Sequence, residues 1–136
     1  MLLVMLDTNV VSSLLDPGDA LHAEALDAVR RWEDRGASFA LSVITWGELL
    51  VGALRRGAEA EKALDRFREA AVDRIVPVGE TTADGAARLR AGDSALRMPD
   101  ALIIATARGI GVEALLTADR KFRGVAPDVV ELIRPN

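Results

Sequence analysis

Short apolar runs alternate with longer helix-like segments along the whole chain, and this alternation limits the folds that the chain can adopt. The runs that read as strands are Leu2–Leu6, Ser38–Leu41, Arg74–Val78, Glu113–Thr117 and Val129–Arg134. The segments that read as helices are Asn9–Leu15, Asp19–Arg35, Val43–Arg55, Glu59–Val72, Thr81–Ala91 and Pro99–Arg108. Strands that alternate with helices imply a parallel sheet covered on both faces. We therefore predict a three-layer α/β/α protein with a central parallel sheet of about five strands.

Composition narrows the class of protein further. A chain of 136 residues fits one domain, so we expect residues 1–136 to form a single unit. No apolar run approaches the roughly 20 residues that cross a membrane, and no basic region precedes the first run as in a signal peptide. The chain has no cysteine, which excludes disulfides and thiolate metal sites. We expect a cytoplasmic protein, and its net charge of −4 argues against electrostatic coating of nucleic acid.

Four carboxylates stand against apolar runs that ought to be buried: Asp7, Glu48, Asp100 and Asp119. Acidic side chains are almost never fully buried unless they are paired or bind a metal ion. Asp7 and Asp119 directly follow predicted strands, whereas Glu48 and Asp100 lie on predicted helices. Because ligands of parallel sheets bind beyond the carboxyl ends of the strands, we expect all four acids to face one rim.

Such a cluster would favour a hard cation. Two unit charges about 4 Å apart repel by about 4 kcal/mol at an effective dielectric constant near 20. Oxygen ligands select Mg²⁺ or Mn²⁺, and metal-activated water suits phosphodiester hydrolysis. Each acid alone also has an ordinary role. Asp7 could cap a helix, Asp100 could be a first-turn acid that the helix dipole favours, and Asp119 could start a turn.

Four sequence motifs resemble those of the PIN-domain nucleases, specifically the VapC-type toxins of bacterial toxin–antitoxin pairs. They occur in the family's order over nearly the whole chain. The motifs are Met5–Val10 (MLDTNV), Ser42–Leu49 (SVITWGEL), Met98–Ala107 (MPDALIIATA) and Leu116–Phe122 (LTADRKF). One departure is Lys121, which stands where many relatives carry a further acid, and this bears on whether a second metal position is filled.

The resemblance implies a metal-dependent endoribonuclease. It implies that Mg²⁺ or Mn²⁺ is held by Asp7, Glu48, Asp100 and Asp119. It further implies supporting positions at Thr8, Asn9, Ser42 and Thr117. Bound metal would position and deprotonate the water that attacks an RNA phosphodiester. For Thr117, an ordinary role as a threonine at a strand end stays open.

The resemblance also implies partners. These are an RNA substrate, a cognate antitoxin that covers the acidic cleft, and a second copy of the chain in a homodimer. The sequence supports association, because large apolar residues are spread over several predicted helices: Trp32, Trp46, Leu50 and Phe67. We expect more apolar helix surface than one core can absorb, and large exposed apolar patches mark interaction sites.

Other interpretations remain open. The chain could be a catalytically silent PIN-like binding module, or a free-standing nuclease without an antitoxin. A phosphatase with Asp7 as nucleophile is weaker, because no second acid stands two residues further on. The basic residues Arg120, Lys121 and Arg123 could contact substrate phosphates or simply form a solvated turn.

Overall fold

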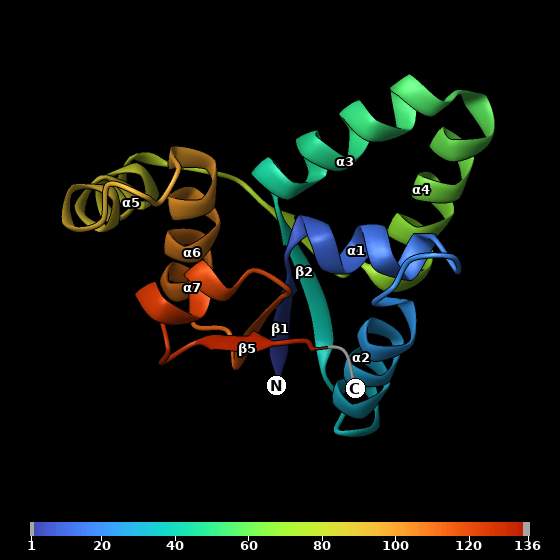
Figure 1. Ribbon diagram of the computed structural model, residues 1–136, viewed down its shortest axis with the longest axis horizontal. Helices are drawn as coiled ribbons and strands as arrows, with labels where there is room; N and C mark the ends of the chain where they lie inside the picture. The colour runs from blue at the N-terminus through green and yellow to red at the C-terminus, as the bar shows by residue number, and fades with distance from the viewer. Residues whose placement is uncertain (1, 135–136) are drawn as a thin grey trace.

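A computed structural model describes residues 2–134 of the chain, which form a parallel sheet of five strands and seven helices (Figure 1). The strands are β1 (Leu3–Leu6), β2 (Ser38–Ser42), β3 (Arg74–Val76), β4 (Ala114–Thr117) and β5 (Val130–Leu132). The helices are α1 (Thr8–Leu15), α2 (His22–Asp34), α3 (Val43–Arg56), α4 (Ala58–Ala71), α5 (Glu80–Gly92), α6 (Met98–Ile110) and α7 (Arg120–Val125). The predicted α/β class is confirmed.

The sheet has the order β3-β2-β1-β4-β5, with β1 at its centre. Val4 of β1 lies opposite Phe39 of β2 and also opposite Ala114 of β4, all in parallel register. Because the chain moves outward from β1 in one direction and later returns to add β4 on the other side, the order reverses between β1 and β4. Such a switch point is where open parallel sheets bind ligands.

Each face of the sheet has its own hydrophobic core. Side chains alternate between faces along a strand, so Val4 and Leu6 point to one side and Met5 to the other. Val4 and Leu6 belong to the core that packs under α1 to α4, while Met5 belongs to the core under α5 to α7. All three residues are at most 1% exposed. The continuous apolar run that predicted a strand buried on both faces therefore behaves as expected.

The main differences from prediction lie at element ends. Helix α2 begins at His22 and not at Asp19, because the Asp19 carboxylate accepts hydrogen bonds from the Leu21 amide and the Ser13 hydroxyl and holds a turn there. Strand β3 ends before Pro77, which has no N–H for a sheet. Strand β5 spans only Val130–Leu132. Helix α7 was not predicted.

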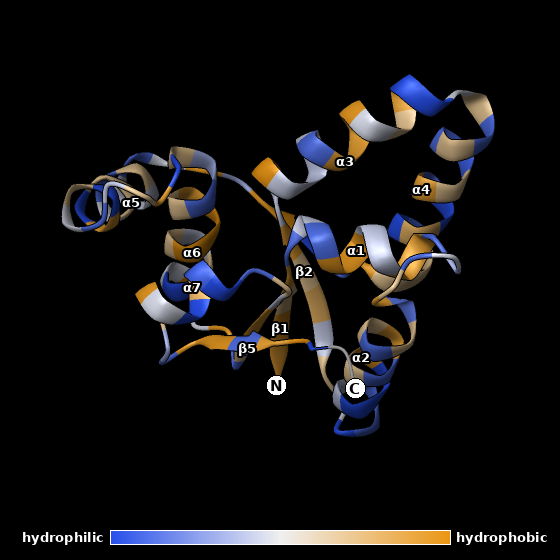
Figure 2. Cartoon of the chain, viewed as in Figure 1, coloured by the Kyte–Doolittle hydropathy of each residue, from blue (hydrophilic) through white to orange (hydrophobic). Residues whose placement is uncertain are grey.

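The exposed apolar side chains belong to other residues than those that the sequence suggested. Trp32 is only 7% exposed, and Trp46, Leu50 and Phe67 pack against the same core. The Arg68 guanidinium also covers the Trp46 ring, 4.7 Å from its centroid. Among the described residues, the exposed large hydrophobic side chains are Val43, Val51, Leu54 and Met98. Three of the four lie on α3, where hydrophobic positions are visible in Figure 2.

Within residues 2–134, no helix combines the length and the apolar character that crossing a membrane would need.

Candidate functional site

Asp7 lies at the centre of the site, directly beyond the end of β1. It caps the N-terminus of α1, and its side chain is only 4% exposed. One carboxylate oxygen, Oδ1, accepts a hydrogen bond from the Thr8 amide at 2.8 Å. The other, Oδ2, accepts from Thr117 Oγ1 at 2.7 Å and from Asn9 Nδ2 at 3.1 Å. These contacts fix the carboxylate at the switch point of the sheet.

A small polar network joins the loops that follow β1 and β4. Asn9 Oδ1 accepts from the Ala118 amide at 2.9 Å, and the Asp119 amide donates to Thr117 Oγ1 at 3.1 Å. Thr117 is fully buried and comes at the end of β4. Asp119 is therefore held two residues beyond a strand that pairs directly with the strand leading to Asp7.

The pKa of Asp7 is raised from 3.8 to about 6, chiefly because burial disfavours the charged carboxylate. The hydrogen bonds from Thr117 and Thr8 act in the opposite direction. The negative charges of Asp100 and Glu48 raise the pKa further. Asp100 and Glu48 therefore lie near enough to Asp7 for their charges to disfavour its ionisation.

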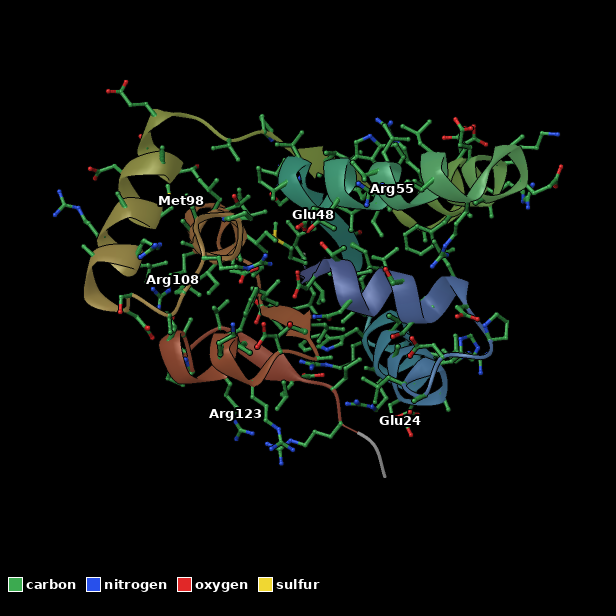
Figure 3. The ribbon with its side chains drawn as sticks, turned by 45° about the horizontal axis from the view of Figure 1, so that its top comes forward. Glu24, Glu48, Arg55, Met98, Arg108 and Arg123 are labelled. Atoms are coloured by element: carbon green, nitrogen blue, oxygen red, sulfur yellow. The ribbon has the colours of Figure 1, made fainter. Side chains whose placement is uncertain are left out.

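Glu48 faces this space from α3, but it is exposed and not buried as the sequence suggested. The buried stripe of α3 consists of Thr45, Leu49 and Ala53, and Glu48 lies beside that stripe. Its Oε1 accepts a hydrogen bond from Thr8 Oγ1 at 2.6 Å. Glu48 is exposed because it faces the polar start of α1 and not the hydrophobic core. Figure 3 shows Glu48 on the part of α3 nearest to α6.

Asp100 lies in the first turn of α6 and is 8% exposed. The guanidinium of Arg97 approaches it, with Nε 3.5 Å from Oδ2. Asp119 is partly exposed and caps α7 by accepting a hydrogen bond from the Lys121 amide at 2.9 Å. The structural role considered for Asp119, starting a turn, is thus realised as a helix cap. Asp119 does not contribute to the pKa shift of Asp7.

The supporting residues fall into two groups. Thr8, Asn9 and Thr117 contact an acid of the site directly. Ser42 is fully buried, and its hydroxyl accepts from the Ile44 amide at 3.1 Å, so its contact is with the start of α3. Sequence reasoning assigned no role to Arg97, although its spacing of three residues from Asp100 in a helix start was a usable signal.

The donor set fits a hard divalent cation. The candidate ligands offer carboxylate oxygens only, and the charges of Asp100 and Glu48 already hinder ionisation of Asp7. In their observed positions, however, no three acidic or histidine side chains among residues 2–134 form a group that could hold an ion. Glu48 is bonded to Thr8, Asp119 to the α7 backbone, and Asp100 faces Arg97.

A sequence model of the PIN domain matches residues 4–127. No curated protein sequence matches the chain. Among solved structures, a toxin–antitoxin complex from Klebsiella pneumoniae is 28% identical, with a TM-score of 0.75 and coverage of 98% of this chain and 99% of that one. The sarcin–ricin loop cleaving toxin VapC20 from Mycobacterium tuberculosis is 25% identical, with a TM-score of 0.75 and coverage of 96% of this chain and 99% of that one. The fold is also similar to VapBC2 from Rickettsia felis bound to promoter DNA, at 18% identity, a TM-score of 0.80 and coverage of 98% and 100%.

Proposed function

Because the chain belongs to the PIN-domain family, we propose that it is the endoribonuclease toxin of a toxin–antitoxin pair and acts in the cytoplasm. The observation that carries the proposal is the buried Asp7 carboxylate, whose pKa is raised in part by the charges of Asp100 and Glu48. A buried carboxylate at the switch point of a sheet, with two further negative charges near it, is costly to the fold unless it serves a charged ligand.

The similar proteins support the choice of substrate and partner. The Mycobacterium tuberculosis structure is of a toxin that cleaves the sarcin–ricin loop, and the Klebsiella pneumoniae structure is of a toxin–antitoxin complex. Both align with this chain over nearly its full length. We extend these properties to the present chain and propose RNA as its substrate and a cognate antitoxin as its inhibitor.

We propose that Mg²⁺ or Mn²⁺ is held by Asp7, Glu48, Asp100 and Asp119. When bound, such a cation supplies charge that offsets the developing charge of the phosphoryl oxygens and makes water a better nucleophile. The polar network orients Asp7: Thr117 and Asn9 both donate to its Oδ2. Thr8 holds Glu48 toward the same space. Arg97 lies 3.5 Å from Asp100 and offsets part of its negative charge.

The proposal is tested by replacing each acid with its amide, which keeps the shape but removes the charge. Asp7→Asn, Glu48→Gln, Asp100→Asn and Asp119→Asn should each reduce divalent-dependent RNA cleavage by about a hundredfold or more, because each weakens cation binding. Asp84→Asn on α5 is the matched control, since this exposed acid pairs with Arg88 on the same helix. Full activity in any two of the four variants would contradict a shared site.

A homodimer is the assembly that we propose. The exposed apolar residues Val51 and Leu54 lie three positions apart on α3 and give the helix an outward-facing apolar side.

A further inference from the structure

Basic residues line a hollow between α7 and the end of β5. The hollow has a volume of about 520 Å³ and is lined by Arg120, Arg123, Gly124, Pro127, Leu132 and Arg134. Arg120 and Arg123 are three positions apart on α7 and therefore share one side of that helix. Arg134 comes from beyond β5. The fold thus adds a distant arginine to the two that the sequence had already suggested.

The three arginines of the hollow have no ion-pair partner among the residues that the structure describes. Among residues 2–134, none of them lies within 4.0 Å of a carboxylate oxygen. The nearby acids have other partners. Asp128 pairs with Arg108 at 2.6 Å, and Glu131 accepts from the Trp32 indole at 3.4 Å and lies 3.9 Å from Arg31. Three exposed positive charges therefore gather in a protein whose net charge is −4.

The hollow adjoins the acids because of the register of the sheet. Thr117 of β4 pairs with Leu132 of β5, and the Ile133 amide donates to the Thr117 carbonyl at 2.8 Å. Asp119 and Arg134 are each two residues beyond this pair, so both lie at the same carboxyl edge, one strand apart. Arg120 directly follows Asp119. Figure 3 shows Arg123 extending outward from the same helix.

We propose that this hollow binds backbone phosphates of the RNA strand on one side of the bond that is cleaved, an inference that rests on the proposed nuclease function. An acidic site repels a polyanion, so the phosphates that flank the reacting one need cations placed just outside the acids. The planar guanidinium of arginine matches a phosphate with two parallel hydrogen bonds. Continuity with the acidic site favours the substrate strand over an acidic protein segment as the occupant.

The test compares Arg120→Gln/Arg123→Gln/Arg134→Gln with wild type for binding to a labelled single-stranded RNA, measured by fluorescence anisotropy. A chelator prevents metal-dependent cleavage during the measurement. The triple variant should bind about tenfold more weakly at low salt. Its plot of log affinity against log salt should be shallower by about two, because each lost phosphate contact removes about 0.7 from the slope on single strands.

Two controls each remove one positive charge, the same loss as in the single variant Arg123→Gln. The first is Lys121→Gln, at a residue of α7 that does not line the hollow. The second is Arg66→Gln, at an exposed residue of α4. Both should bind RNA within about twofold of wild type. If they weaken binding as much as Arg123→Gln does, the effect is general electrostatics and the inference is wrong. Unchanged melting temperatures would show that all variants are folded.

Cleavage kinetics separate this inference from the proposed function. The triple variant should show a KM raised about tenfold on a long RNA, unchanged kcat, and no change on a dinucleotide too short to reach the hollow. If the wild type cleaves RNA and the triple variant has the same RNA affinity and KM, the proposed role of the hollow is wrong and the nuclease function stands. A wild type that binds RNA through these arginines but cleaves none would overturn the nuclease function alone. Loss of antitoxin binding with unchanged RNA affinity would assign the hollow to a protein and overturn the inference.

Discussion

At the scale of the residue, Asp7 shows how two opposing influences set one ionisation. It accepts three hydrogen bonds, from Thr8, Asn9 and Thr117, which favour the charged carboxylate. Its pKa is nevertheless raised to about 6, because burial and the neighbouring negative charges act more strongly. An acid that costs the fold energy when it ionises is suited to a position where a cation is expected to bind.

The metal-free protein should therefore lose stability as the pH rises through this window. A carboxylate with a raised pKa binds its proton more tightly in the folded than in the unfolded chain, so its contribution is fully present below about 4 and is lost by about 6. A shift of about two units corresponds to about 3 kcal/mol in the free energy of unfolding. Asp7→Asn, which cannot ionise, should not lose this contribution. The measurement is the denaturant midpoint of both proteins in chelator from pH 4 to about pH 7.

A further variant tests the direction of the pKa shift of Asp7 independently. Thr117→Val removes a hydrogen-bond donor that favours the charged form, so it should move the window to higher pH. Parallel pH profiles for wild type and Asp7→Asn would contradict the assignment, because all other titrating groups are common to the two proteins.

The burial of a residue could be predicted from the sequence where its neighbours along the chain determine it. Asp7 follows a strand buried on both faces, so its burial could be read from Leu2–Leu6. The exposure of Glu48 could not be read, because it depends on how α3 turns relative to α1. Arg134 reaches the edge of the site only through pairing of β4 with β5, and no local pattern predicts that pairing.

At the scale of the element, α7 is too short for the hydrophobic periodicity of its sequence to predict a helix. The helix has six residues, contains Gly124, and among its residues only Phe122 is buried. A single buried side chain cannot define a helical stripe, which needs several apolar positions over at least two turns. From the sequence, Asp119 was given the role of starting a turn, because no apolar stripe follows it to indicate a helix. Longer helices such as α3 and α6 were located to within two residues at each end.

Ser42 positions α3 and should be tested as a helix cap. Its buried hydroxyl accepts from the Ile44 amide, so Ser42→Ala leaves that amide without its partner. The expected loss in the free energy of unfolding is about 1 kcal/mol, measured by urea denaturation. Because α3 carries Glu48, RNA cleavage should fall as well. Ser94→Ala, at an exposed turn, is the control and should change neither quantity. A variant of Ser42 with wild-type stability would show that the cap contributes little.

At the scale of the whole molecule, the layers were predictable and the strand order was not. Alternating strands and helices require a covered parallel sheet, since each crossover helix must pack on a face. Nothing local, however, says on which side of β1 a later strand will add. The order β3-β2-β1-β4-β5 brings the ends of β1 and β4 together, and this pairing creates the network between Asn9 and Ala118 that joins the two loops.

The arrangement of exposed apolar side chains gives the last prediction. Val51 and Leu54 are 46% and 57% exposed on one side of α3, which with α4 projects from the body in Figure 1. A two-fold axis would pack this side against its copy and remove both side chains from water, at about 25 cal/mol per Å² of apolar surface. Light scattering should therefore give twice the mass of the chain, and Val51→Glu/Leu54→Glu should give the mass of one chain.

Ala87→Glu on the exposed side of α5 adds charge away from α3 and should leave the dimer intact. A wild type that is monomeric at tens of micromolar would contradict self-association. If that monomer bound the antitoxin and the double variant did not, α3 would be the antitoxin's surface. The RNA cleavage activity of the monomeric variant Val51→Glu/Leu54→Glu would also show whether one chain carries a complete site. Both substitutions lie on α3, the helix that carries Glu48. Retained activity is the expected result, because every acid that the site uses comes from the same chain.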